Sequence, residues 1–166
     1  MRNRNGKTMQ EIYLKAMDAA VNYLSYRARP AAKVAEYLEK KGFDEHIIAQ
    51  VMERLTENHL VDDDALAKRY VELHKGNDGR FLLRQKLKKM GLEQDVIDRS
   101  VSGLSHQEQV EAARQLLEKK LKTDERPDAL RRAMQSVLRR GYPYDVVRAA
   151  AEDYRAQLEE EEWESD

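Results

Sequence analysis

The chain has 166 residues, which is enough for one ordinary domain or a short array of repeats. Charged residues make up 37% of it and hydrophobic residues 41%, a balance that favours an elongated helical body over a compact globule. It contains no cysteine, which excludes disulfides and thiolate metal sites and favours a cytoplasmic protein. No apolar run approaches the roughly 20 residues that span a bilayer, so we expect no membrane association.

The first third of the chain predicts three helices. Residues 8–11 (TMQE) form a capping box, and the apolar side chains of residues 9–24 then recur at helical spacing. Pro30 suits the first turn of a second helix, which ends at Gly42. Asp44 can cap a third helix, so the glycine marks a turn between two helices.

The same order of elements recurs twice. In the middle third, Asp62 opens a helix, residues 76–79 (GNDG) form a turn, and the next helix ends at Gly91. In the last third, residues 105–108 (SHQE) form another capping box, and Gly141 ends a helix. A last helix then runs into the acidic end of the chain.

The three glycines that end these helices are regularly spaced. Gly42 and Gly141 directly follow a basic pair, and Gly91 follows one after Met90. The glycines lie 49 and 50 residues apart, a period typical of tandem supersecondary units. No segment alternates with a period of two, so we expect no strands. The sequence predicts an all-α protein of three tandem three-helix repeats in an elongated, curved array. The expected boundaries are a lead-in at 1–16, repeats at 17–61, 62–104 and 105–158, and an acidic tail at 159–166.

Charge is unevenly distributed along the chain. The formal net charge is −1, but residues 152–166 carry eight acids and one arginine, so residues 1–151 sum to +6. A basic body with an acidic tail suggests a polyanionic partner or an anionic protein partner. The other interpretation is a solvated helix end that aids solubility, and both remain open at this point.

The sequence offers little support for catalysis. The four histidines are dispersed without metal-ligand spacing, and no phosphate loop, nucleophile elbow or dinucleotide fingerprint is present. The densest acidic run, residues 62–64, fits a helix N-terminus, which favours negative charge. We therefore expect no catalytic residue, no metal site and no cofactor.

Basic residues gather in three places. Residues 79–91 contain five bases and no acid, and Arg80, Arg84 and Lys88 lie four apart on one helical stripe. Residues 129–144 contain four bases and no acid. The helix dipole also stabilises basic residues in a last helical turn. That effect does not explain Arg80 or Arg84, nor why these segments contain no acid. The predicted basic, partner-binding face comprises Arg27, Arg29, Lys33, Arg80, Arg84, Lys86, Lys88, Lys89, Arg131, Arg132, Arg139 and Arg140.

The order of these motifs resembles the RecX family of regulatory proteins. The resemblance rests on residues 60–63 (LVDD), 66–71 (LAKRYV) and 79–92, together with 20–27 and 138–142, and covers about residues 17–157. Three residues depart from the family pattern, and they affect packing and local charge: Leu66, Met90 and Pro143.

The resemblance implies a modular all-α regulator that binds the recombinase RecA. Family members are thought to lie in the groove of the RecA filament on DNA, where they inhibit ATP hydrolysis and strand exchange and so modulate recombination, DNA repair and the SOS response. It implies a non-enzymatic monomer with weaker, non-specific binding to single- and double-stranded DNA. The alternative is a helix-turn-helix-like protein that binds duplex DNA, since basic-glycine turns between short helices also fit that class.

Overall fold

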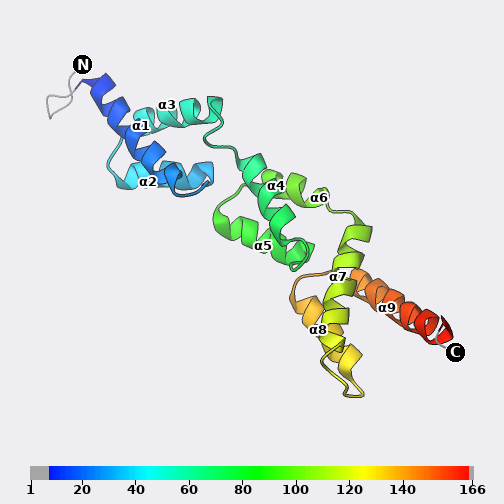
Figure 1. The fold of residues 1–166 in the computed structure, drawn as a ribbon. Helices are drawn as coiled ribbons and strands as arrows, with labels where there is room; N and C mark the ends of the chain where they lie inside the picture. Colours follow the sequence, from blue (N-terminus) through cyan, green and yellow to red (C-terminus); the bar gives the residue numbers. More distant parts are fainter. Residues whose placement is uncertain (1–7, 165–166) are drawn as a thin grey trace.

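The computed structural model describes residues 8–164, and this part of the chain contains nine α-helices and no β-strand. In chain order the helices are α1 (Met9–Ser25), α2 (Ala31–Lys40), α3 (Glu45–Glu57), α4 (Asp63–His74), α5 (Arg80–Met90), α6 (Gln94–Ser102), α7 (His106–Leu121), α8 (Ala129–Arg139) and α9 (Tyr144–Glu164). The predicted all-α array of three-helix repeats is confirmed. We refer to α1–α3 as unit 1, α4–α6 as unit 2 and α7–α9 as unit 3. The units follow one another along one long axis (Figure 1).

Local capping explains where several helices begin. Thr8 and Ser105 each accept from the backbone of a glutamate three residues on, and that glutamate bonds back to the cap, which completes a capping box. Asp44 and Asp62 cap α3 and α4 through their carboxylates. These four starts follow from short sequence signals alone.

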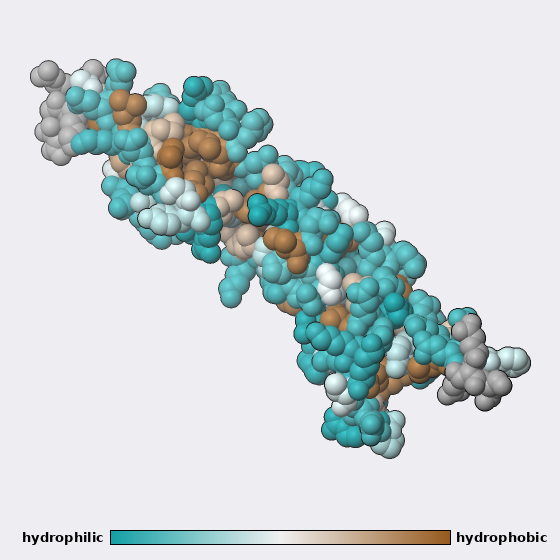
Figure 2. All heavy atoms as spheres, in the orientation of Figure 1, coloured by the Kyte–Doolittle hydropathy of each residue, from teal (hydrophilic) through white to brown (hydrophobic). Residues whose placement is uncertain are grey.

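Each unit has its own hydrophobic core, because its three helices pack on one another. Alanines at the helix crossings, such as Ala20, Ala67 and Ala113, are fully buried and allow the first helix of each unit to approach its neighbours closely. The cores are thin, and Figure 2 shows hydrophilic residues over most of one face, with apolar patches on unit 1. Because each hydrophobic core lies within one unit, other contacts must join one unit to the next.

The first junction lies between units 1 and 2. There Asp63 Oδ1, in the first turn of α4, accepts a 2.9 Å hydrogen bond from the backbone N–H of Ala31, at the start of α2. Among residues 8–164 this is the single hydrogen bond that crosses the first junction. The aliphatic part of Lys33 also lies over Gly91, at 3.4 Å from where a Cβ would be.

The second junction lies between units 2 and 3, and backbone pairs directly with backbone there. The N–H of Gly79 donates to Arg140 O at 2.8 Å, and the N–H of Phe81 donates to Gly141 O at 3.0 Å. The hydroxyl of Tyr142 donates to Lys75 O at 3.0 Å. Tyr142 is 2% exposed, and burial raises its pKa to about 12.

Two glycines make this close approach possible. A Cβ on Gly79 would lie 2.2 Å from Tyr142 N, and a Cβ on Gly141 would lie 2.4 Å from Leu82 N. Gly141 also has a φ of +83°, in the left-handed region, as do Gly42 and Gly91 at the equivalent helix ends. The glycine of unit 3 therefore ends a helix and also admits the backbone of unit 2.

Candidate functional site

A basic hollow of about 600 Å³ lies at the first junction. Five cationic side chains line it, and no acidic side chain does: Arg27, Arg29, Lys33, Lys86 and Lys89. The first three come from unit 1 and the last two from α5 of unit 2. The structure thus brings together five of the twelve predicted basic residues, from segments more than 50 residues apart in the sequence.

Arg29 is held in place by an aromatic stack. Its guanidinium carbon lies 4.2 Å from the centre of the Tyr23 ring, and Tyr23 stacks on Tyr37 with 4.1 Å between ring centres. Lys41 lies 5.5 Å from the centre of the Tyr37 ring on the same column. The Nε atom of Arg29 is buried and has no hydrogen-bond partner. The aromatic stack therefore holds a positively charged group at the hollow, where it attracts an anion.

The other four cations of the hollow differ in their pairing. Lys33 lies 3.0 Å from Glu36, and Lys86 lies 2.5 Å from the buried carboxylate of Asp78. Within residues 8–164, Arg27 and Lys89 have no carboxylate within ion-pair distance. The hollow therefore keeps an excess of positive charge.

One residue of each ion pair, Lys86 and Glu36, has a shifted pKa. The hydrogen bond to Asp78 raises the pKa of Lys86. Hydrogen bonds from Lys40 and Lys33 lower the pKa of Glu36 to about 2. Lys86 is therefore cationic and Glu36 anionic at neutral pH.

Two of the three residues in the predicted basic stripe on α5 bind other residues of this protein. Arg80 donates from Nη2 to Leu104 O at 3.1 Å, and its backbone N–H donates to the Oε1 atom of Gln109 at 3.0 Å. Arg84 pairs with Asp98. Lys88 is exposed. Because Leu104 and Gln109 flank the start of α7, Arg80 contributes to the second junction, and its role toward a partner remains a prediction.

The basic residues of unit 3 are divided in the same way. Arg140 donates to Asn77 O at 3.2 Å, across the second junction. Arg131 and Arg132 pair with Asp128, and Arg132 also pairs with Asp124, so these guanidinium groups are neutralised locally. Arg139 is exposed and lines a hollow of about 910 Å³ that also contains Asp124 and Glu125. That larger hollow has mixed charge and suits an anion less well than the hollow at the first junction.

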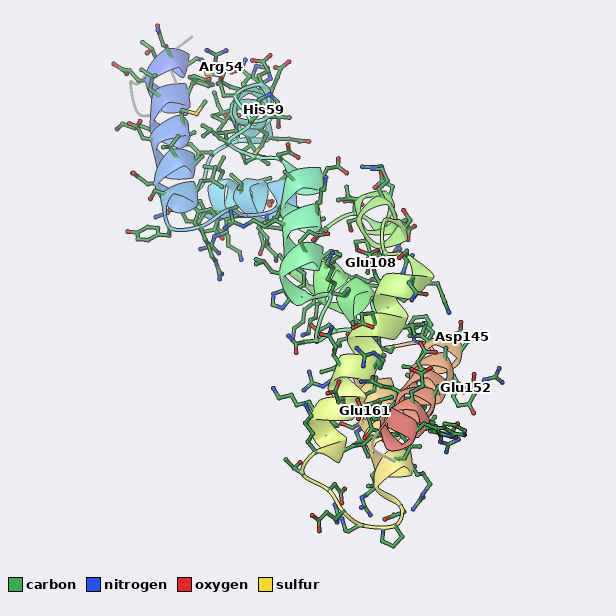
Figure 3. The ribbon with its side chains drawn as sticks, turned by 45° about the vertical axis from the view of Figure 1, so that its right-hand side comes forward. Arg54, His59, Glu108, Asp145, Glu152 and Glu161 are labelled. Atoms are coloured by element: carbon green, nitrogen blue, oxygen red, sulfur yellow. The ribbon has the colours of Figure 1, made fainter. Side chains whose placement is uncertain are left out.

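The acidic end of the chain lies far from the first junction. Residues 159–164 are part of α9, and Figure 3 shows Glu152 and Glu161 along that helix, whereas Arg54 and His59 mark unit 1 at the other end of the molecule. Unit 2 lies between α9 and unit 1, and charges in solution are screened beyond a Debye length of about 10 Å at 0.1 M salt. The acids of α9 therefore leave the charge of the basic hollow uncompensated.

Sequence reasoning missed three residues that build the site and its surroundings. Helical spacing treats Tyr23 as a core residue and does not single out Tyr37, yet the two rings position Arg29. Asp78 is 6% exposed and binds Lys86, although it stands in a turn, where aspartate is ordinarily solvated. The one available signal is its place between two glycines, which is typical of a tightly packed turn.

The described residues hold neither a cluster of metal ligands nor a membrane-spanning helix. In residues 8–164 no group of three or more potential metal ligands converges. No helix in that range is both long enough and apolar enough to cross a membrane. Residues 62–64, the densest acidic run, instead supply the α4 cap, the bond to Ala31 and an ion pair with Arg99.

Comparison with known proteins gives consistent matches. The family model for the first three-helix domain of RecX matches residues 16–55, and the model for its third three-helix domain matches residues 107–150. The chain is 34% identical over 137 residues to the regulatory protein RecX of Chlorobaculum tepidum, covering 80% of this chain and 84% of the relative. It is 36% identical over 157 residues, or 91% of this chain, to the regulatory protein RecX of a Geobacillus species, strain WCH70. The chain covers 58% of that longer relative.

The fold also matches a solved structure. The crystal structure of RecX from Lactobacillus salivarius aligns with a TM-score of 0.81 over 89% of this chain and 99% of that chain. The two sequences are 24% identical, so this match supports the fold.

Proposed function

Since the chain belongs to the RecX family of regulatory proteins, we propose that it binds the filament that the recombinase RecA forms on DNA. Bound there, it inhibits the ATP hydrolysis and strand exchange of the filament, and so modulates recombination and DNA repair. It acts as a non-enzymatic monomer in the cytoplasm. The observation that carries the proposal is the basic hollow at the first junction, on a body long enough to follow an extended partner.

The charge pattern supports a partner that contains nucleic acid. A nucleoprotein filament exposes regularly spaced phosphates, and a cluster of uncompensated Lys and Arg gains free energy there by releasing condensed counterions. The aromatic stack that positions Arg29 and the long body add shape complementarity to this electrostatic attraction. Bare single- or double-stranded DNA offers the phosphates without the protein surface, so we propose weaker and non-specific binding to it.

A helix-turn-helix-like duplex reader is the alternative. Such a protein inserts the N-terminal part of a recognition helix into the major groove. The third helix of each unit has an exposed acid in its first turn: Glu45, Asp95 and Asp145. Acids in that position repel phosphate, which favours the filament over the duplex as the principal partner.

The test is RecA-dependent ATP hydrolysis on single-stranded DNA, measured with the cognate RecA. The wild-type protein should lower the rate at concentrations near or below that of RecA. A double variant, Arg27→Gln with Lys89→Gln, should need about tenfold more protein for the same effect, which corresponds to about 1.4 kcal/mol. Neither side chain has an ion-pair partner in residues 8–164, so the variant should fold normally.

A charge-matched control separates the site from net charge. Lys119→Gln with Arg155→Gln removes the same charge from exposed positions on unit 3 and should inhibit like the wild type. An unchanged ATPase rate with the wild-type protein would contradict the proposal. Tight, sequence-specific binding to a bare duplex would favour the alternative.

A further inference from the structure

The basic hollow joins two parts of the molecule that are otherwise weakly connected. Its cations belong to both sides, with Arg27, Arg29 and Lys33 in unit 1, and Lys86 and Lys89 in unit 2. The side chain of Lys33 lies beside Gly91, where α5 ends. A ligand that fills the space among these side chains therefore contacts both units at once.

The direct links across the first junction are few. Within residues 8–164 one hydrogen bond crosses it, from Ala31 to Asp63, and the helices pack within their own units. Like charges brought together in the hollow repel one another, and this repulsion opposes closure of the two units. Without an anion, the angle between units 1 and 2 is held by that hydrogen bond and by local packing.

An anion in the hollow turns the repulsion between the cations of units 1 and 2 into attraction toward a common ligand. A group with at least two negative charges attracts the cations of both units and replaces repulsion by two-sided binding. Five cationic side chains offer more donors than the two oxygens of one carboxylate can accept, whereas neighbouring phosphates offer enough oxygens. The volume of about 600 Å³ also exceeds that of a single small anion.

We infer that the hollow is a phosphate-binding site whose ligand bridges units 1 and 2 and fixes the angle between them. The ligand is a pair of neighbouring phosphates on a nucleic-acid strand. This inference rests on the proposed function for the identity of the ligand, and it adds a conformational consequence: unit 1 becomes fixed on unit 2 when the strand is bound. The second junction, closed by backbone pairing, keeps its geometry with or without ligand.

The absence of cysteine allows a direct measurement on the full chain. Spin labels at Glu53→Cys and Ser102→Cys report the distance between units 1 and 2, and labels at Ser102→Cys and Gln135→Cys report the distance between units 2 and 3. All three positions are exposed. Pulsed electron resonance then gives each distance distribution before and after addition of pyrophosphate, and calorimetry gives the affinity of the unlabelled protein.

Pyrophosphate should narrow the distribution between units 1 and 2 and leave that between units 2 and 3 unchanged. The Arg27→Gln, Lys89→Gln variant should bind it about tenfold more weakly, and the Lys119→Gln, Arg155→Gln control should bind it like the wild type. The inference is overturned by equal affinity in all three proteins, by binding that leaves both distributions unchanged, or by no binding at millimolar concentration.

Two further ligands identify the source of the phosphate. A 12-nucleotide dT strand should bind more tightly than ADP and narrow the same distribution, because a strand presents neighbouring phosphates repeatedly. Tighter binding of ADP would overturn the assignment to a strand. The ATPase test is independent of these measurements. Inhibition of RecA without pyrophosphate binding would refute the bridging site alone, and binding without inhibition would refute the proposed function alone.

Discussion

The two junctions of the array are built in opposite ways. The second junction is closed by backbone hydrogen bonds between Gly79 and Arg140 and between Phe81 and Gly141, with the buried hydroxyl of Tyr142 beside them. The first junction has one side-chain-to-backbone bond and a cluster of like charges. One repeat architecture can therefore contain a rigid joint, set by the fold itself, and a joint whose geometry depends on what binds to it.

Adding one methyl group to the second junction should produce the largest effect. In Gly79→Ala the new Cβ would lie 2.2 Å from Tyr142 N, and backbone atoms cannot move aside as a flexible side chain can. We expect the free energy of unfolding to fall by about 3 kcal/mol, the upper end for overpacking, as measured by urea denaturation.

Two other glycines serve as controls for this substitution. A Cβ added to Gly76 would meet nothing within 4 Å, and its φ is not positive, so Gly76→Ala should change stability by less than about 0.5 kcal/mol. Gly42 has a φ of +87° with open space around it, so Gly42→Ala should cost about 1 to 2 kcal/mol from backbone strain alone. Equal losses in Gly42→Ala and Gly79→Ala would contradict the close backbone approach at the second junction.

Tyr142 makes the second junction sensitive to alkaline pH. Its pKa is raised from 10.0 to about 12 by burial, so its stabilising contribution is fully present below about pH 10 and is lost as pH rises through 12. A shift of this size corresponds to about 2 to 3 kcal/mol at the alkaline limit. Urea denaturation of the wild type between about pH 9 and pH 11.5 should show most of this loss.

Tyr142→Phe isolates that contribution. The variant lacks the hydrogen bond to Lys75 O and should be about 1 kcal/mol less stable than the wild type at neutral pH. Because phenylalanine does not titrate, the variant should lose less stability on alkalinisation, so the two stability curves should cross near about pH 11 and the wild type should be the less stable protein above that pH. Parallel pH profiles would show that the phenol of Tyr142 does not titrate at a shifted pKa.

A substitution at the first junction should have only a modest effect on stability. Asp63→Ala removes the acceptor for Ala31 N–H, which lies in an otherwise uncapped helix start, and should cost about 1 kcal/mol. The distance distribution between units 1 and 2 should broaden in the absence of ligand, while that between units 2 and 3 stays the same. A change confined to the second junction would contradict the separation of the two joints.

Short-range chemistry made much of the fold predictable from the sequence. The capping boxes at Thr8 and Ser105, the cap at Asp44 and the left-handed glycine at Gly91 each depend on residues within four positions, and the structure contains all of them. The apolar stripe of α5 was likewise predictable, because helical period alone decides which face of a helix is buried.

The candidate site was only partly predictable from the sequence, because it depends on contacts between residues that are far apart in the sequence. Helical period puts Arg80 on a basic stripe, but it cannot show that Leu104 O lies within its reach. Nor can it show that Arg29 would stack on Tyr23, or that Lys89 would face the same hollow as Arg27. Arg80 bonds to a residue 24 positions away, and Lys89 lines a hollow with a residue 62 positions away; the packing that brings these segments together has no local signature.

The position of Trp163 has an experimental consequence. It is the one tryptophan of the chain and is 87% exposed, near the end of α9 and away from all three cores. Its indole is surrounded by water in the folded state as in the unfolded state, so tryptophan emission should change little when the cores melt. The same position makes it an intrinsic optical reporter of the acidic end of the protein. A partner that covers that end should shift the emission to shorter wavelength, whereas a partner held at the first junction should leave the emission unchanged.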